Sequence, residues 1–190
     1  MPIENIIQHC CLFPVRNLGL YLTNWTVELT GITNFVFLLS LLDKRVNEKK
    51  GWLAFTHLLF EISAGLNICV VLVYWSIVHE KEIPKWTHNN YMYAHMYLVH
   101  TLPALSLLMI FLSNDVVFKS GHWRACPPTA LAYAIVNYLE TKKRGAPLYW
   151  FLTWEDHTSV LISAAMAMGM SAIWVGAATL TQALKAHMGG

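Results

Sequence analysis

The chain has 190 residues, of which 56% are apolar and only 13% are charged, and its formal net charge is +2 at neutral pH. This composition is more apolar than that of an ordinary soluble domain and indicates a polytopic membrane protein. The small net charge and the dispersed Lys and Arg residues exclude a nucleic-acid groove. We therefore expect partners among membrane lipids, lipid-like substrates and other membrane proteins, and no nucleic acid.

Uncharged runs separated by short charged loops predict the membrane-spanning helices. A hydrocarbon core about 30 Å thick takes about 20 helical residues to cross. We expect an all-α integral membrane helical bundle with one transmembrane domain over residues 22–187, preceded by an interfacial N-terminal segment at residues 1–21. The five predicted spans are Leu22–Leu42, Gly51–Val78, Tyr91–Leu112, Ala125–Leu139 and Thr158–Leu184.

The first span carries a stripe of threonines, Thr23, Thr26, Thr30 and Thr33, at three- and four-residue steps. This spacing places their hydroxyls along one face of a helix. Such hydroxyls commonly bond back to carbonyls of their own helix or hold two helices together. Thr26 has a second interpretation, as a nucleophile, which comes from the resemblance described below.

The second span contains two ionisable side chains one helical turn apart, His57 and Glu61. A charged residue at the centre of a bilayer costs roughly 2.5–3.5 kcal/mol, so the pair should face protein and not lipid. The carboxylate either neutralises the imidazole as an internal strut or orients it as a base. Gly65 continues the same face and allows another helix to approach closely.

The third span supplies His95 and His100, followed by Pro103. On a regular helix, side chains five residues apart point about 140° apart, so the two histidines need not serve one site. Pro103 is expected to bend the helix axis and to free a carbonyl near residue 99, an irregularity that polar pockets use.

The loop over residues 145–157 is too apolar for a solvated connector, because it contains the run Leu148-Tyr149-Trp150-Phe151-Leu152 and then Trp154. This aromatic density is typical of the headgroup level of a membrane. The segment either roofs a lipid-binding cavity or forms an anchor belt without a ligand.

Three of these motifs together resemble the androgen-induced protein and rolling-stone superfamily of polytopic membrane proteins. They are the run Tyr21–Thr26 at the start of the first span, His95 with Leu102 and Pro103 after it, and the run Pro147–Leu152 before the last helix. Some members of that family are intramembrane threonine hydrolases that cleave fatty acid esters of hydroxy fatty acids. The resemblance implies the endoplasmic reticulum or another internal membrane.

The resemblance implies a lipid-ester hydrolase in which Thr26 is the nucleophile and His95 is the base, while a small register shift selects His100 instead. A threonine hydroxyl needs a base within about 2.6–3.2 Å that takes its proton during attack on the ester carbonyl. Preorganised donors must then stabilise the oxyanion. Asn34, Asn67 and His57 are candidates for that role, and Glu61 and His57 are candidates for support of the base.

Two other functions stay open at this stage. The hydrolases of the family show six spans and a second histidine three residues after the first, where this chain has Leu98. These differences favour a non-catalytic structural or accessory subunit of a membrane protein complex. A metal or haem site would use His57, Glu61, His95 and His100 as ligands. No local ligand motif such as H-E-x-x-H supports it, so no metal and no cofactor are predicted.

Overall fold

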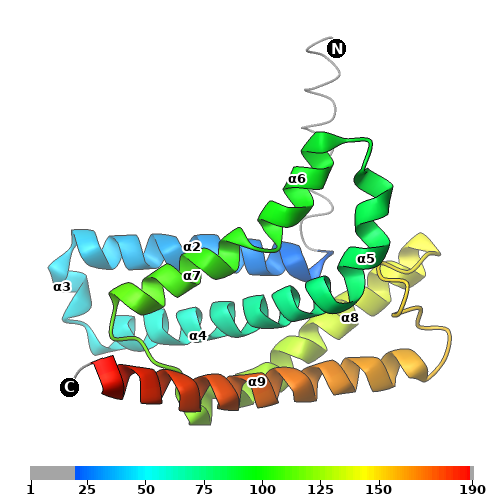
Figure 1. Cartoon of the computed structure of the whole chain (residues 1–190). Helices are drawn as coiled ribbons and strands as arrows, with labels where there is room; N and C mark the ends of the chain where they lie inside the picture. The colour runs from blue at the N-terminus through cyan, green and yellow to red at the C-terminus, as the bar shows by residue number, and fades with distance from the viewer. Residues whose placement is uncertain (1–19, 189–190) are drawn as a thin grey trace.

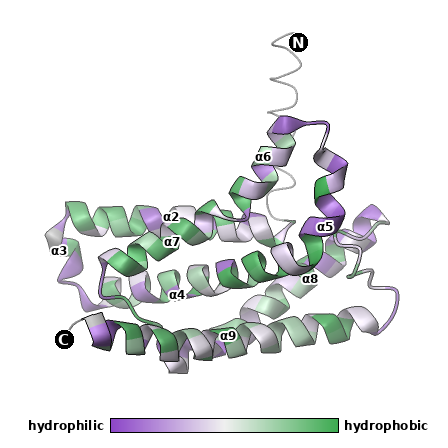
Figure 2. Cartoon of the chain, viewed as in Figure 1, coloured by the Kyte–Doolittle hydropathy of each residue, from purple (hydrophilic) through white to green (hydrophobic). Residues whose placement is uncertain are grey.

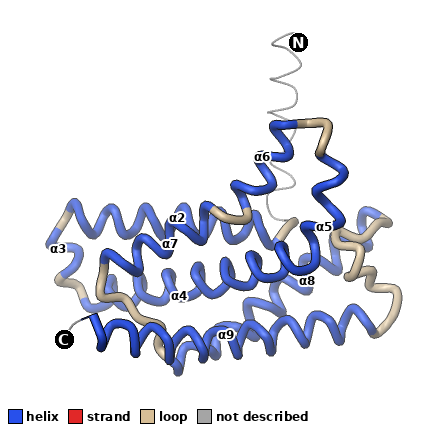
Figure 3. Tube along the Cα trace, viewed as in Figure 1, coloured by secondary structure: helices blue, strands red, loops and turns tan. Residues whose placement is uncertain are grey.

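The computed structural model describes residues 20–188, and within them every regular element is helical (Figure 3). The predicted all-α fold is confirmed for this part of the chain, and residues 1–19 of the predicted interfacial segment lie outside it. In chain order the elements are α2 (Leu22–Leu42), α3 (Lys44–Asn47), α4 (Lys50–Val73), the π-helical turn η2 (Tyr74–Val78), α5 (His79–Glu82), the 3-10 turn η3 (Ile83–Trp86), α6 (Asn90–Val99), α7 (Leu102–Ser113), the 3-10 turn η4 (Ser120–Ala125), α8 (Cys126–Arg144) and α9 (Thr158–Met188).

The long helices form a bundle around α4. Helix α4 contacts α2, α7 and α9, while α8 packs against α9 and crosses the bundle obliquely (Figure 1). The segment from α5 to α6 rises steeply out of the bundle, near the start of α2 (Figure 1). The central position of α4 agrees with its burial, since 56% of its most apolar window is buried against 11–28% in the other three candidate spans.

Four helical stretches within residues 20–188 are long and apolar enough to cross a membrane. They coincide with four of the five predicted spans and cover Leu22–Leu42, Lys50–Trp86, Asn90–Ser113 and Thr158–His187. Large apolar side chains are exposed along these stretches. Figure 2 shows the hydrophobic residues along these helices in green. The predicted span Ala125–Leu139 also forms a helix, α8, but the charged residues Glu140, Lys142 and Lys143 near its end make it less apolar.

Helix α9 packs closely against α4 at Gly65. A Cβ atom added at Gly65 would lie 3.1 Å from the ring of Trp174, which is fully buried. The indole N–H of Trp174 donates to the carbonyl oxygen of Lys119 at 3.2 Å. The close helix approach predicted at this glycine is therefore confirmed. The hydrogen bond from Trp174 attaches the segment between α7 and η4 to the core.

Two irregularities interrupt the helices at the end of the bundle where α2 begins. Helix α4 passes into a π-helical turn that starts at Tyr74. The third span is divided at His100 and Thr101, with Pro103 in the first turn of α7. The break predicted from Pro103 is confirmed, because proline lacks an amide N–H and crowds the preceding turn. Single π-helical turns are frequent at functional sites.

Candidate functional site

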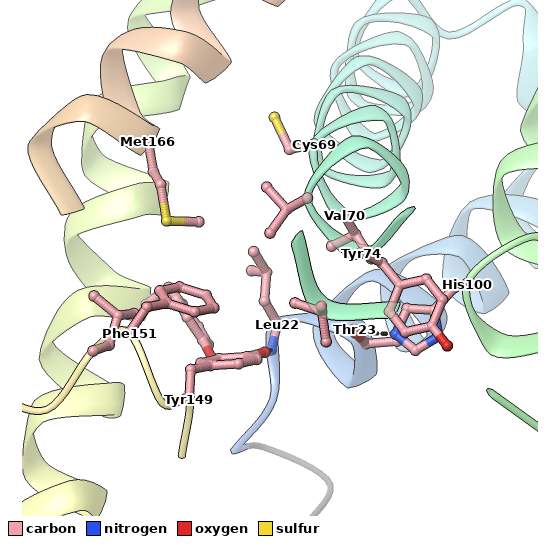
Figure 4. A pocket seen from close by; sticks show the side chains of 13 residues that line it. Leu22, Thr23, Cys69, Val70, Tyr74, His100, Tyr149, Phe151 and Met166 are labelled. Atoms are coloured by element: carbon pink, nitrogen blue, oxygen red, sulfur yellow. Dashed lines mark hydrogen bonds between the residues drawn. The ribbon is translucent and has the colours of Figure 1, made fainter. Parts of the chain in front are cut away.

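A hydroxyl and an imidazole from two different spans meet where these irregularities lie. Thr23 belongs to the first turn of α2, and its Oγ1 lies 3.1 Å from Nε2 of His100, at the break between α6 and α7 (Figure 4). The Thr23 side chain is half-buried and that of His100 is buried. This distance is within the range that proton transfer requires.

The partner of the second ring nitrogen fixes the tautomer of His100. Nδ1 lies 2.6 Å from the carbonyl oxygen of Met96, the last-turn carbonyl that the helix break leaves accessible. Because a carbonyl oxygen only accepts, Nδ1 carries the proton and donates it. Nε2 therefore presents its lone pair to the Thr23 hydroxyl, which donates to it. This is the arrangement of a nucleophile beside a base that a third group orients.

The Thr23–His100 pair lies between two cavities of different size and polarity. The larger one, hereafter the chamber, has a volume of about 520 Å³ and a mixed lining that includes Asn24, Glu82 and His95. The smaller one, hereafter the recess, measures about 50 Å³ and is lined mainly by apolar side chains of α2, α4 and α9 (Figure 4). Thr23, His100 and Tyr149 line both cavities.

The aromatic segment of residues 145–157 closes one side of both cavities. Leu148 and Trp150 line the chamber, and Phe151 and Leu152 line the recess. Of the two interpretations that the sequence left open, the cavity roof agrees with this geometry. The ring of Trp150 also lies under the Lys81 ammonium, which is 3.4 Å from the ring centroid and so holds α5 against the segment.

Tyr149 ties this segment to the start of α2. The amide N–H of Leu22 donates to the Tyr149 hydroxyl at 3.3 Å, and Tyr133 of α8 donates to the carbonyl oxygen of Leu20 at 3.2 Å. Burial and the neighbouring Tyr133 raise the pKa of Tyr149 above its ordinary value. The phenol stays protonated at neutral pH, and these bonds fix the first turn of α2, which carries Thr23.

The imidazole of His100 is also held by an aromatic ring. Tyr74, the first residue of the π-helical turn, stacks on it with ring centroids 3.5 Å apart and an interplanar angle of 7°. The Tyr74 hydroxyl lies 3.4 Å from Nδ1 of His79. The π-helical turn therefore supplies one wall of the site.

The structure separates the pair that the resemblance implied. The Thr26 hydroxyl is fully buried and donates to the carbonyl oxygen of Thr23 at 2.7 Å, as the back-bonding interpretation expected. His95 lines the chamber and stacks with Tyr91, with centroids 6.2 Å apart. Thr26 lines neither cavity, whereas His95 and His100 line the same chamber because the helix break changes the direction of the chain between them.

The two asparagines considered as oxyanion donors lie among the polar contacts that join helices. Asn34 donates to Ser106 of α7 at 3.2 Å. Asn67 donates to Thr30 at 2.9 Å and to the carbonyl oxygen of Ser63 at 2.8 Å. Neither asparagine lines the chamber or the recess. The bond of Asn67 to Thr30 and the bond between Thr33 and Ser63 show that Thr30 and Thr33 of the stripe face α4.

His57 and Glu61 form a second polar cluster, near η4. Nε2 of His57 lies 3.6 Å from the fully buried Glu61 carboxylate and donates to the carbonyl oxygen of Val117 at 2.7 Å. The same carboxylate accepts from the Lys119 amide N–H and from Nδ1 of His122. Within residues 20–188 the structure brings no three His, Cys, Asp or Glu side chains together so that they could hold a metal ion. These hydrogen bonds attach the segment from Val117 to His122, which precedes α8, to helix α4.

The sequence contained a signal for His100, since Pro103 marks a break close to it. It contained none for His122, which lies in the short turn η4 and contacts Glu61, 61 positions earlier in the chain. Thr23 was visible only as one of four threonines. Its position in the first turn of α2 distinguishes it, because the first amide N–H groups of a helix have no intrahelical partner.

Over residues 20–188 the fold and site define an all-α protein with several helices compatible with a multi-pass membrane protein, and with a hydroxyl–imidazole pair between two cavities. Comparison of the chain with protein-family models, with curated proteins and with solved structures found no match.

Proposed function

We propose that this protein is an intramembrane lipid-ester hydrolase in which Thr23 is the nucleophile and His100 is the general base. The observation that carries the proposal is the 3.1 Å contact between the Thr23 hydroxyl and the imidazole, at the junction of the two cavities. The resemblance to the androgen-induced protein and rolling-stone superfamily agrees with this class of reaction. The resemblance implied Thr26 and His95 as the catalytic pair, whereas the proposed pair is Thr23 and His100. His100 is the histidine that a small register shift selects.

In the first half of the reaction, Oγ1 of Thr23 attacks the ester carbonyl carbon while its proton passes to Nε2 of His100. The first turn of α2 favours the oxyanion that forms, because the dipole of the helix places partial positive charge at its N-terminal end. His100 then returns the proton to the departing alkoxide. The C–O bond to the alcohol breaks and the acyl group remains on Thr23.

In the second half, a water molecule from the chamber attacks the acyl-threonine while His100 accepts one of its protons. The tetrahedral species collapses, the C–O bond to Thr23 breaks, and His100 returns the proton to the threonine oxygen. The Met96 carbonyl and the face of the Tyr74 ring both favour the imidazolium that forms in each half. No carboxylate is needed to orient His100, because the Met96 carbonyl oxygen already accepts the bond from Nδ1.

Expressed protein in detergent micelles, assayed on nitrophenyl and long-chain lipid esters, tests the proposal. We expect Thr23→Ala and His100→Ala each to lower kcat at least about 10³-fold, and Thr23→Ser to retain activity. Thr26→Ala and His95→Ala form the comparison pair and should leave most activity. Loss of activity in that pair, with Thr23→Ala and His100→Ala still active, would return the assignment to Thr26 and His95.

A second function, an accessory subunit of a membrane complex, is favoured by Glu28. Its side chain is exposed in the α2 span and lines a groove with Ile32, Ile62 and Ala132. Within residues 20–188 no hydrogen bond or ion pair engages it. A carboxylate at such a place is stabilised by a basic residue of a neighbouring helix. Purification distinguishes the functions: stoichiometric partners and no labelling of Thr23 by an alkyl fluorophosphonate favour the subunit, and labelling of Thr23 favours the enzyme.

A further inference from the structure

The two cavities that meet at Thr23 differ about tenfold in volume, and this difference constrains the substrate. The chamber, at about 520 Å³, is within the range of small-molecule sites. The recess measures about 50 Å³. A water-sized group occupies about 10–15 Å³ of such space, so the recess holds roughly three to five carbon-sized groups. An ester bound across Thr23 therefore has one short arm and one bulky arm.

The order of the reaction steps indicates which cavity binds the acyl group and which binds the alcohol. After the first half of the reaction the acyl group is still bonded to Thr23, whereas the alcohol must leave and water must reach the same carbon. The chamber is wide enough for both movements and offers polar groups such as Asn24, Asn89 and Glu82. The recess is narrow and its lining is mainly apolar, with Leu22, Val70 and Val73 among its residues. The acyl group, which stays on Thr23, therefore suits the recess, and the alcohol, which must leave, suits the chamber.

We infer that the recess is an acyl-binding site which limits the substrate to acyl chains of about four carbons or fewer, on esters of bulkier alcohols that occupy the chamber. Met166 of α9 and Cys69 of α4 lie on the side of the recess away from Thr23 and His100 (Figure 4). Met166 therefore sets the length of the recess. This inference rests on the proposed hydrolysis at Thr23.

The test is a series of nitrophenyl esters of acetate, butyrate, octanoate and palmitate, hydrolysed by the full-length protein in detergent. We expect kcat/KM to fall at least about tenfold between butyrate and octanoate, the scale of the cost of unaccommodated methylenes. Met166→Ala should extend activity to octanoate, and Met166→Trp should confine it to acetate. Met168→Ala, on the exposed side of the same helix, is the matched control and should keep the wild-type profile.

Labelling of Thr23 by a methyl fluorophosphonate in each variant verifies that the catalytic pair is intact, so that a changed profile reports the recess. Thr23-dependent hydrolysis that is fastest with octanoate or palmitate, or a profile that neither Met166 variant changes, overturns the inference and leaves the proposed hydrolase standing. Absence of hydrolysis of every ester, or hydrolysis that survives Thr23→Ala, overturns the proposed function and this inference with it.

Discussion

The imidazole of His100 lies flat on the phenol ring of Tyr74, with ring centroids 3.5 Å apart and planes 7° from parallel. Tyr74 comes from the π-helical turn after α4, and His100 from the break between α6 and α7. Two local departures from regular helix thus meet face to face. Both lie beside Thr23, whose hydroxyl contacts His100.

Replacement of the Tyr74 ring should slow the proposed reaction through its charged intermediate state. A ring face attracts an imidazolium by about 2 kcal/mol in a desolvated site and a neutral imidazole by less. Tyr74→Leu should therefore lower kcat about 10–30-fold with little change in KM, and Tyr74→Phe should restore most of the loss. Steady-state kinetics measure this difference. An equal loss in the Phe and Leu variants would assign the effect to the hydroxyl instead of the ring.

The contact between Gly65 and Trp174 should limit side-chain size at residue 65. Because a Cβ there would already lie 3.1 Å from a fully buried indole, Gly65→Leu must displace α9 from α4. We expect a loss of roughly 1–3 kcal/mol, measured as a lower Tm in detergent. Gly176→Leu is the matched control, because nothing lies within 4 Å of a Cβ at that glycine. Equal Tm values for the two variants would contradict the assigned close approach.

Loss of the Glu61 charge should weaken the attachment of the chain before α8. The carboxylate accepts from the Lys119 amide and from His122, and it is completely buried. Glu61→Gln replaces one acceptor oxygen by an amide donor, so we expect a loss of at least about 2 kcal/mol. Thermal unfolding and protease cleavage between residues 114 and 125 measure it. Exposed Glu48→Gln should change neither readout, and unchanged cleavage in Glu61→Gln would argue against this anchor.

Trp154 adopts a left-handed backbone conformation, with φ at 58°, at the end of the aromatic segment. Its amide donates to Ser159 at 2.8 Å and its indole N–H donates to Asn137 at 2.6 Å, so the turn is held from both sides. Trp154→Ala and Trp154→Gly remove the same ring, but only glycine adopts this conformation without steric cost. The Gly variant should be more stable by about 1 kcal/mol in thermal unfolding. A more stable Ala variant would contradict this account.

Sequence reasoning located the long helices well, since hydropathy over some twenty residues is a local property. The bounds of the first span, Leu22–Leu42, are those of α2, and the break near Pro103 was anticipated for the correct reason. The contact of His57 with Glu61 follows from their spacing on one helix. The contact between Thr23 and His100 did not follow in the same way, because four threonines shared one stripe and two histidines shared one span.

The sequence by itself determined that residues 20–188 are helical with several apolar spans, because the hydrophobic effect and backbone hydrogen bonding act on each segment independently. Only the tertiary structure decided that Thr23 and not Thr26 meets a histidine. That choice depends on the rotation of α2 against α4, and on the helix break that turns His100 toward Thr23. The two residues are 77 positions apart, so their contact depends on how whole helices pack together. The sequence of one segment alone does not determine that packing.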